Sequence, residues 1–219
     1  VRKEGRYWIQ TLKAPGINDF DRLEHNVKLT SWNPARPVID WRLHEDHLAG
    51  EKLKSILAKS EQDLKVKFST DVWRRTALIK VRNGLLEYAL DEGCIKARYN
   101  NRTIQIPIAE IEIESKEGDF TPVIIHARQL VAKYSARLDS RTKAQRGYWA
   151  AHGQIYGPAI RGDDVSLGGG TDSRILAGLF QSCLRQILGN ASEINAGLDQ
   201  YDEHLHQLRV GLRRLKTAM

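Results

Sequence analysis

The N-terminal part of the chain alternates strand-forming and polar residues, which predicts two β-strands within residues 6–29. Residues 6–13 are rich in strand formers and end at Ala14-Pro15-Gly16, a sequence that interrupts regular structure. The second strand, at residues 22–28, alternates polar side chains with Leu23 and Val27. Because successive strand residues point to opposite sides, one face of this strand is predicted to be strongly polar.

A longer β-patterned region covers residues 66–115. Turn-forming pairs interrupt it at three points, which are Asn83-Gly84, Glu92-Gly93 and Asn100-Asn101. An Asn-Gly pair between strand-like segments is a strong hairpin signal. The region therefore predicts an antiparallel meander of short strands.

Apolar residues at helical spacing predict helices in the remaining segments. Surface helices are expected over residues 45–60 and 120–136, the latter capped by Asp119. A broad apolar stripe follows at residues 175–188, and a last helix is expected from Ser192 to the end. Its stripe consists of Leu205, Leu208, Leu212 and Leu215. Two amphipathic helices do not bury both stripes without further partners, so we expect the C-terminal domain to be truncated.

A glycine-rich stretch separates these last two helices from the β-rich part. It covers residues 151–171 and predicts a flexible linker. The predicted organisation is an α+β domain over residues 1–150, this linker, and a helical segment over residues 172–219. The chain begins at Val1 with strand-like sequence, and we expect it to be cut from a longer protein.

The composition is that of a globular protein with a core. Hydrophobic residues make up 41% of the chain and charged residues 28%. No run approaches the roughly 18 apolar residues of a membrane-spanning helix, so a membrane-spanning protein is excluded. A membrane is not predicted as a partner. The two cysteines lie far apart, so neither a disulfide framework nor a cysteine metal cluster is expected, and a reducing, cytoplasmic setting is predicted.

The net charge is +7, and the first 150 residues carry the whole excess. They hold 27 Lys and Arg against 20 Asp and Glu, whereas residues 151–219 hold seven of each. A positive field favours an anionic partner: nucleic acid, a membrane surface or a phosphate-rich small molecule. No recognition helix and no basic region with interleaved aromatics is found, so nucleic acid is not the predicted partner.

The segment Ala109-Glu110-Ile111-Glu112-Ile113-Glu114 carries the most informative side chains. In a strand its three carboxylates point to one side, about 7 Å apart, and its isoleucines to the other. Such a row needs water, cations or basic partners to offset the repulsion. It is either the solvated face of a half-buried edge strand or a site for a hard divalent ion such as Mg²⁺.

Other predicted strands have similar polar faces. Glu87, Ala89 and Asp91 share one face, Arg22 and Glu24 share another, and Arg75, Ala77 and Ile79 share a third. Charges of both signs inside a barrel suit a ligand with several negative charges and metal ions, because carboxylates hold metal while Lys and Arg bind phosphate oxygens. A sheet with one ordinary solvated face is the alternative.

Several short pieces, taken in order and spacing, resemble a known family. They are Val1-Arg2 (the end of a Leu-Arg-x-Arg strand), Thr11-Leu12-Lys13, Arg22-Leu23-Glu24, Phe68-Ser69-Thr70, Arg75-Thr76-Ala77-Leu78, Glu87-Tyr88-Ala89-Leu90-Asp91-Glu92-Gly93, the acidic segment 109–114, Glu117-Gly118-Asp119 and residues 140–148. On these pieces, residues 1–150 resemble the CYTH domain of the triphosphate tunnel metalloenzymes. The resemblance implies a closed antiparallel β tunnel with flanking helices.

The resemblance also implies roles for individual residues. Arg2, Lys13 and Arg75 would grip triphosphate oxygens, with Arg74 the alternative if the register differs by one. Glu24, Asp91, Glu110 and Glu112 would hold one or two Mg²⁺ or Mn²⁺ ions. Lys143 would contact the phosphate or the attacking water and is the predicted catalytic residue. Glu87 and Glu114 are interpreted as ion-pair partners and Arg146 as a structural residue.

One part of the family pattern is missing from this chain. The family's Glu-x-Glu-x-Lys strand should lie upstream of Arg2, and without it we expect that the tunnel does not close as in the family. We therefore expect the parent protein to hydrolyse triphosphate and this fragment to have little or no activity.

The segment from His206 to Leu215 is similar to the opening of a CHAD domain, a helical module that often follows CYTH in bacterial proteins similar to inorganic triphosphatases. This resemblance implies a polyphosphate-binding surface on the last helix. The residues that would form it are His206, Arg209, Arg213 and Arg214. A solvated basic face without a ligand is the alternative for this helix.

Together these resemblances imply metal-dependent hydrolysis of inorganic triphosphate to pyrophosphate and phosphate. Within the family the alternatives are adenylyl cyclase and thiamine triphosphatase, although no base-binding pocket is recognised. A polyphosphate-binding module without catalysis is the alternative from another class.

Overall fold

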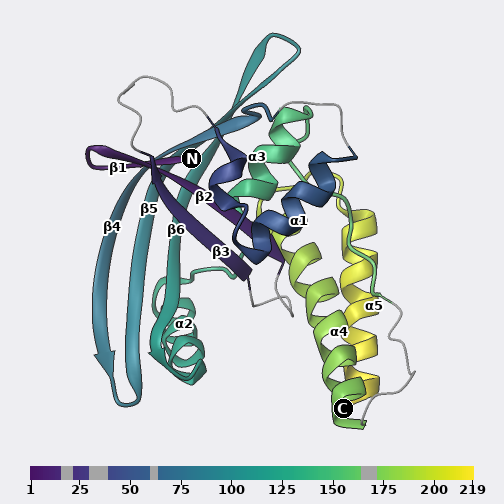
Figure 1. Cartoon of the computed structure of the whole chain (residues 1–219). Coiled ribbons are helices and arrows are strands. Elements are labelled where there is room, and N and C mark those ends of the chain that lie inside the picture. The colour runs from purple at the N-terminus through teal and green to yellow at the C-terminus, as the bar shows by residue number, and fades with distance from the viewer. Residues whose placement is uncertain (16–21, 30–38, 60–63, 164–171) are drawn as a thin grey trace. The chain divides into compact units, whose positions relative to one another are not determined.

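The computed structural model describes residues 1–15, 22–29, 39–59, 64–163 and 172–219 (Figure 1). The chain forms two compact units, residues 1–65 and residues 66–219. Each unit contains one three-stranded antiparallel sheet, and the described residues form no closed barrel. The predicted α+β class with antiparallel sheets and flanking helices is confirmed, but the closed tunnel is not found.

The sheet of the first unit has the order β1 (Arg2–Glu4), β2 (Tyr7–Pro15), β3 (Arg22–Leu29). A short 3₁₀ helix, η1 (Trp41–His44), leads into α1 (Leu48–Leu57). The helix predicted over residues 45–60 is therefore shorter than expected. Its N-terminus is capped by the His47 ring, which accepts a hydrogen bond from the backbone of Ala49.

The β2–β3 register gives this sheet two different faces, as the alternation predicted. Lys13 pairs with Glu24 and Leu12 with His25, so the first pair faces one side and the second pair the other. Helix α1 packs on strands β2 and β3, and η1 packs on β3. The side chains on the face of Leu12 and His25 are mostly apolar, whereas Lys13 and Glu24 lie on a polar face.

Buried polar side chains join η1 to this sheet. Gln10 accepts a hydrogen bond from the backbone of Asp40 and donates to the Asp40 carbonyl at 2.6 Å and to His44 Nε2 at 3.0 Å. His44 is buried, and its Nδ1 lies 3.0 Å from Nδ1 of His25, whose ring stacks on His47. The orientation of the Gln10 amide makes His44 Nε2 an acceptor, so the proton of a neutral His44 ring is on Nδ1. This network requires an uncharged His44.

The sheet of the second unit consists of three long strands, β4 (Phe68–Val81), β5 (Gly84–Tyr99) and β6 (Arg102–Gly118). The predicted turns at Asn83-Gly84 and Asn100-Asn101 are confirmed, and both asparagines of the second turn have positive φ. The break predicted at Glu92-Gly93 is wrong, because β5 runs through it. A side chain at Gly93 would collide with the Asp71 carbonyl of β4, so glycine permits close strand pairing here rather than a turn.

Four helices follow this sheet: α2 (Thr121–Tyr134), α3 (Lys143–Ala151), α4 (Asp172–Asn195) and α5 (Asp202–Ala218). Helix α2 confirms the prediction over residues 120–136, and the Asp119 carboxylate accepts a hydrogen bond from the Thr121 backbone at 2.7 Å. Helix α3 was not predicted. Helix α4 extends beyond the apolar stripe at residues 175–188 that predicted it. The last helix, α5, begins at Asp202, ten residues later than the predicted start at Ser192. None of the helices in the described part is long and apolar enough to cross a membrane.

Buried polar side chains contribute to the interface between α4 and α5. The buried positions of α5 are His204, Gln207 and Gly211. Leu205, Leu208 and Leu215 of the predicted leucine stripe are half-buried and Leu212 is 50% exposed, so the stripe is only partly buried, as expected for two helices without further partners. A Cβ at Gly211 would lie 2.9 Å from Ile187 Cγ1, so the missing side chain lets the helices approach closely. Gln186 of α4 donates to Gln207 at 2.8 Å across this interface.

Part of the predicted flexible linker packs against α4. The Ile160 backbone exchanges two hydrogen bonds with the Asn190 side chain, at 3.1 and 2.8 Å. The Asp163 carbonyl accepts from Ser182 at 3.2 Å. Residues 157–163 are therefore bound in place, contrary to the prediction, while residues 164–171 of the linker lie outside the described residues.

Candidate functional site

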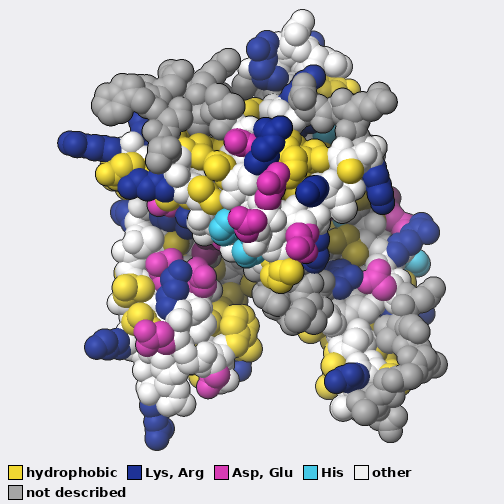
Figure 2. Space-filling model, in the orientation of Figure 1, with side chains coloured by type: hydrophobic (Ala, Val, Ile, Leu, Met, Phe, Trp, Pro, Cys, Tyr) yellow, Lys and Arg dark blue, Asp and Glu magenta, His cyan; other side chains and the backbone are white. Residues whose placement is uncertain are grey.

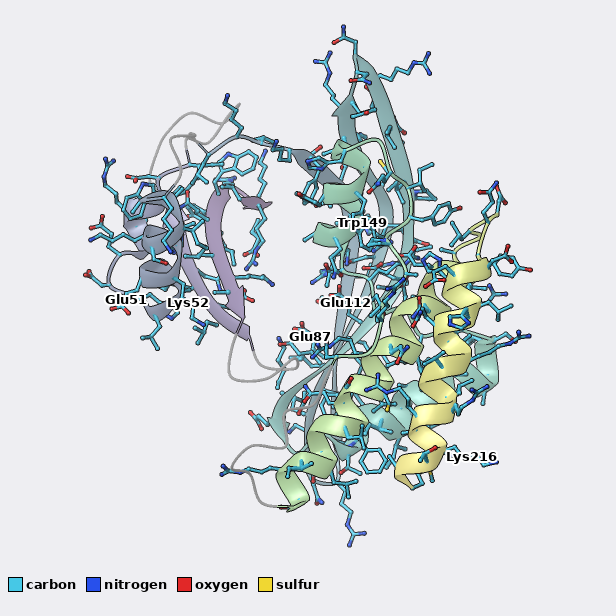
Figure 3. All side chains as sticks on the ribbon, turned by 90° about the vertical axis from the view of Figure 1, so that its right-hand side faces the viewer. Glu51, Lys52, Glu87, Glu112, Trp149 and Lys216 are labelled. Carbon is cyan, nitrogen blue, oxygen red and sulfur yellow. The ribbon has the colours of Figure 1, made fainter. Side chains whose placement is uncertain are left out.

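Three carboxylates converge on one face of the β4–β6 sheet. Asp91 of β5 lies directly opposite Glu110 of β6, and Glu112 follows two residues later on the same face. One oxygen of each carboxylate lies within 4.8 Å of the others. Glu112 and Glu87 both project from this face, as the strand register requires (Figure 3). The three residues Asp91, Glu110 and Glu112 are called the acidic cluster below.

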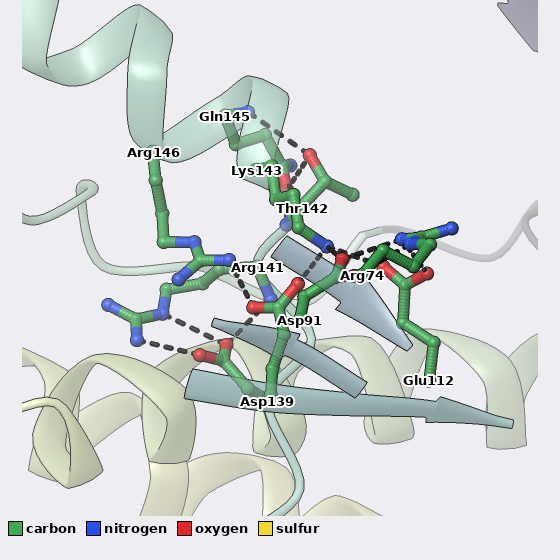
Figure 4. Close-up of polar contacts among 10 residues, drawn as sticks. Arg74, Asp91, Glu112, Asp139, Arg141, Thr142, Lys143, Gln145 and Arg146 are labelled. Atoms are coloured by element: carbon green, nitrogen blue, oxygen red, sulfur yellow. Dashed lines mark hydrogen bonds and ion pairs between the residues drawn. The ribbon is translucent and has the colours of Figure 1, made fainter. Parts of the chain in front are cut away.

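Arg74 of β4 completes the row across the sheet, because it pairs with Asp91 in the β4–β5 register. Its guanidinium makes a bidentate contact with Asp91, Nε to Oδ1 and Nη2 to Oδ2, both at 2.6 Å (Figure 4). Nη2 also donates to Glu112 Oε2 at 2.8 Å. A bidentate arginine holds both carboxylates in a fixed orientation.

Helix α3 contributes two more cations from its first turn. The Lys143 ammonium lies 2.7 Å from Asp91 Oδ2 and 2.7 Å from Glu112 Oε1, and it also contacts Glu110. Arg146 donates to Glu110 Oε2. Lys143 and Arg146 are three residues apart and therefore lie on the same face of the helix. The site thus contains three carboxylates and three basic side chains, and Figure 4 labels Asp91, Glu112 and the three basic residues.

The start of α3 is fixed by local sequence. Thr142 caps the helix by accepting from the Gln145 backbone at 3.1 Å, and the Gln145 side chain accepts from the Thr142 backbone at 2.8 Å. This reciprocal capping box satisfies two backbone donors at the helix N-terminus. Gly147 lies so close to Phe68 of β4 that a Cβ would collide with the ring. The cap and this contact hold the first turn of α3 against the sheet.

Burial and ion pairing together set the ionisation of the acidic cluster. The Asp91 side chain is fully buried, and burial alone would raise its pKa. The contacts with Arg74 and Lys143 outweigh burial and hold the pKa of Asp91 below its ordinary value. Burial similarly opposes the charge on Lys143, but its three carboxylate partners raise its pKa. The hydrogen bond to Asp91 raises the pKa of Arg74. All three groups therefore remain charged at neutral pH.

Arg146 has one unused donor beside the acidic cluster. The residue is 6% exposed, and its Nε has no hydrogen-bond partner among the described residues. A buried, unpaired donor on a charged group is costly, so a water molecule or an anionic ligand is expected to satisfy it. Arg146 was interpreted as structural, and its contact with Glu110 places it in the candidate site itself.

Arg75 does not lie with the acidic cluster. Its register partner is Leu90, so its side chain is on the opposite face of the sheet from Arg74 and Asp91. There it forms an exposed ion pair with Glu92 at 2.9 Å. Arg74, the alternative to Arg75, is therefore the arginine that lies on the same face as the acidic cluster, and the placement of Arg75 there is wrong. A shift of one residue moves a side chain to the other face, which is why the motif alone left both arginines open.

Glu87 and Glu114 lie further along the same sheet face and are ion-pair partners, as interpreted from the sequence. Lys116 contacts Glu87 at 3.3 Å and Glu114 at 2.9 Å. This pair of carboxylates and its lysine resemble the acidic cluster in charge but involve no residue of α3.

The predicted residues of the first unit share the polar face of their own sheet. Lys13 lies 2.9 Å from Glu24, and Arg2 lies 3.9 Å from the same carboxylate. Thr11 donates to Asn26 at 2.6 Å, and Asn26 donates to Glu24 at 3.1 Å. The hydrogen bond from Lys13, aided by Asn26, lowers the pKa of Glu24. The predicted residues Arg2, Lys13 and Glu24 are therefore brought together on one polar face, where Glu4 also pairs with Arg2.

The basic residues of α5 divide into two groups. His206, Arg209 and Arg213 are exposed, and Lys216 lies near the C-terminal end of the helix (Figure 3). Arg214 instead turns inward, donating to Gln186 at 3.0 Å and to the Asp163 carbonyl at 3.1 Å. Its predicted place on an exposed anion-binding surface is corrected, because both contacts hold α5 to neighbouring segments.

Surface charge does not mark the candidate site. Over the described part of the visible face, Lys and Arg side chains are interspersed with Asp and Glu (Figure 2). The acidic cluster is distinguished by its local ion pairs.

The comparison with known families agrees with this geometry. Residues 1–148 match the model of the CYTH domain. The chain therefore belongs to the CYTH family, whose members are triphosphate tunnel metalloenzymes that depend on metal ions and act generally as hydrolases or cyclases. Three convergent carboxylates fit such an ion, since Mg²⁺ and Mn²⁺ prefer oxygen ligands.

Proposed function

We propose that this protein takes part in metal-dependent hydrolysis of inorganic triphosphate to pyrophosphate and phosphate. The observation that supports it most directly is the convergence of three carboxylates and three basic side chains on one face of the β4–β6 sheet. Carboxylates suit a divalent cation, and guanidinium and ammonium groups suit phosphate oxygens. Membership of the CYTH family supports a triphosphate as substrate.

In this proposal the acidic cluster would hold a Mg²⁺ or Mn²⁺ ion, and Glu24 keeps its proposed role as a metal ligand on the polar face of the first unit. When bound, such an ion would neutralise charge on the phosphate oxygens. Arg74, Lys143 and Arg146 would orient the triphosphate chain, and Arg2 and Lys13 would contribute further phosphate contacts. Lys143 would contact the terminal phosphate or the attacking water, which displaces pyrophosphate in line with the bond that breaks.

The exposed basic side chains of α5 have a separate proposed role. His206, Arg209 and Arg213 would bind polyphosphate, in keeping with the similarity of this segment to the start of a CHAD domain. Binding of this kind depends on exposed charge, so it should weaken steeply with added salt. Arg214 is omitted from the proposal because it is used in helix packing.

The adjacent arginines of β4 provide a matched test of the triphosphate site. Binding of tripolyphosphate and release of phosphate are measured with Mg²⁺ for the wild type, Arg74→Ala and Arg75→Ala. We expect Arg74→Ala to reduce binding at least roughly tenfold, since a charge-assisted contact is lost, and Arg75→Ala to leave it nearly unchanged. Binding is scored together with turnover, so that binding without hydrolysis can be recognised.

Several outcomes would redirect the proposal. Equal losses of tripolyphosphate binding in Arg74→Ala and Arg75→Ala would mean that triphosphate does not bind at the sheet face that carries the acidic cluster. Tight binding with no hydrolysis would favour a non-catalytic polyphosphate-binding module. Preferential turnover of ATP or thiamine triphosphate would assign a different activity of the family.

A further inference from the structure

The Lys143 ammonium occupies the space on which the acidic cluster converges. It lies 2.7 Å from oxygens of Asp91 and Glu112 and also contacts Glu110, so each of the three carboxylates accepts one contact from it. An ammonium group has three donors, and this arrangement uses all of them. The side chain is 18% exposed, so water competes little for these contacts.

A divalent cation and this ammonium cannot share the same oxygens. Mg²⁺ binds carboxylate oxygens at about 2.0–2.1 Å. An ammonium nitrogen held within hydrogen-bond distance of the same atoms would then lie almost in contact with the ion, with no ligand between two positive charges. One of the two must leave when the other binds.

We propose that Lys143 and the metal ion are mutually exclusive occupants of the acidic cluster, and that metal binding moves the Lys143 ammonium away from the cluster and frees it for a phosphate ligand. This inference rests on the proposed function, because it takes the acidic cluster as the metal site. It makes Lys143 a positioning residue that couples the two binding events, in addition to its contact with phosphate.

The exchange would involve the side chain of Lys143 rather than the backbone. The capping box of Thr142 and Gln145 and the contact of Gly147 with Phe68 fix the first turn of α3. Lys143 is the first residue of that turn, and its four-carbon side chain rotates freely about its own bonds. A released ammonium would stay at the helix N-terminus, where an anion is also favoured by the helix dipole.

Charge balance gives the direction of the coupling. The three carboxylates are neutralised by Lys143, Arg74 and Arg146, so a divalent ion entering alone leaves the site with excess positive charge. A triphosphate carries enough negative charge to offset both the ion and the displaced ammonium. Metal binding without triphosphate is therefore expected to be weakened by Lys143.

The first test measures Mn²⁺ binding without triphosphate by electron paramagnetic resonance of the free ion. The whole chain is compared as wild type, Lys143→Met and Lys116→Met. Lys116 is the matched control because it pairs with two carboxylates of the same sheet face outside the acidic cluster. We expect Lys143→Met to bind Mn²⁺ at least roughly tenfold more tightly, since a charge-assisted competitor is removed, and Lys116→Met to match the wild type.

A second test uses the unmodified protein and so does not depend on the folding of a variant. Lysines are reductively methylated with and without Mn²⁺, and modified peptides are quantified by mass spectrometry. We expect Mn²⁺ to increase modification of Lys143 several-fold and to leave Lys116 unchanged. Unchanged or reduced modification of Lys143 in protein that binds Mn²⁺ would overturn the exchange.

The outcomes separate this inference from the proposed function. Equal Mn²⁺ affinity of wild type and Lys143→Met would refute the exchange while leaving the acidic cluster as a metal site. Weaker Mn²⁺ binding by Lys143→Met would refute it as well. Absence of Mn²⁺ binding in every variant would remove the metal site and with it both proposals.

Discussion

Asp91 and Glu112 share the same two cationic partners but differ in burial, which gives a sharp prediction about stability. Both carboxylates contact Arg74 and Lys143. The Asp91 side chain is 0% exposed and the Glu112 side chain 49% exposed. The variants Asp91→Asn and Glu112→Gln each remove one charge at nearly constant shape, so burial is the main difference between them.

The expected cost follows from that difference. Removing one member of a buried ion pair costs about 3–5 kcal/mol, because the remaining charges stay desolvated. Removing one member of an exposed pair costs about 1 kcal/mol or less. Arg74 is 44% exposed, so solvent takes up part of the loss and the lower figure of about 3 kcal/mol applies to Asp91→Asn.

Urea unfolding followed by circular dichroism measures this difference. With a slope of roughly 3 kcal/mol per molar urea, Asp91→Asn should lower the midpoint by about 1 M and Glu112→Gln by no more than about 0.3 M. The pKa of Asp91 is lowered from 3.8, so its stabilising effect is present above that pH and is lost as the pH falls through the lowered pKa. The gap between wild type and Asp91→Asn should therefore narrow below pH 3.8. A midpoint shift for Asp91→Asn no larger than that for Glu112→Gln would refute this reasoning.

Three further predictions concern other parts of the chain. Burial beside two other histidines lowers the pKa of His44 from 6.5, so the contribution of His44 to stability should be constant above pH 6.5 and decline as the pH falls below it. Thermal melts at a series of pH values should show this decline, and a melting temperature that is constant from pH 7 to pH 5 would contradict it. Gly147→Ala should destabilise the protein by about 1–3 kcal/mol, because its Cβ would collide with Phe68, and an unchanged melting temperature would show that α3 shifts freely. Arg214→Met should lower the melting temperature, whereas the exposed neighbour Arg213→Met should not, and equal effects would argue against the inward role of Arg214.

The candidate site illustrates which features a sequence pattern specifies. Alternation alone predicted that Asp91 and Glu87 share one face of their strand and that Glu110 and Glu112 share one face of theirs. The structure agrees with both predictions. Alternation does not give the register between strands, so it did not decide which neighbouring arginine of β4 faces Asp91. That choice depends on the pairing of Arg74 with Asp91, which lies 17 residues later in the sequence.

Helix α3 was missed although its start carries a local signal. Thr142 and Gln145 have the spacing of a capping box, but only nine residues follow, too few to show a long apolar stripe. The helix is stabilised by packing against the sheet rather than by an amphipathic stripe. A search for capping boxes in polar segments would have found it.

The leucine stripe of α5 predicts only part of the face that is buried. Periodicity identifies a face that can be buried, but it does not identify which neighbour covers it. In this structure the face toward α4 carries Gln207, and its hydrogen bond with Gln186 compensates for its burial. Tertiary hydrogen bonds of this kind leave no periodic signal in the sequence.

The polar interface of α4 and α5 has a consequence for how precisely the two helices are aligned. A seam of leucines can slip by one turn and still fill its gaps, because apolar contacts have little directional preference. Slippage here would separate Gln186 from Gln207 and leave buried amide groups without partners, at a cost of about 1–3 kcal/mol for each. The helix pair is therefore locked in one axial position, and any surface built from its outward residues keeps a constant spacing of charges.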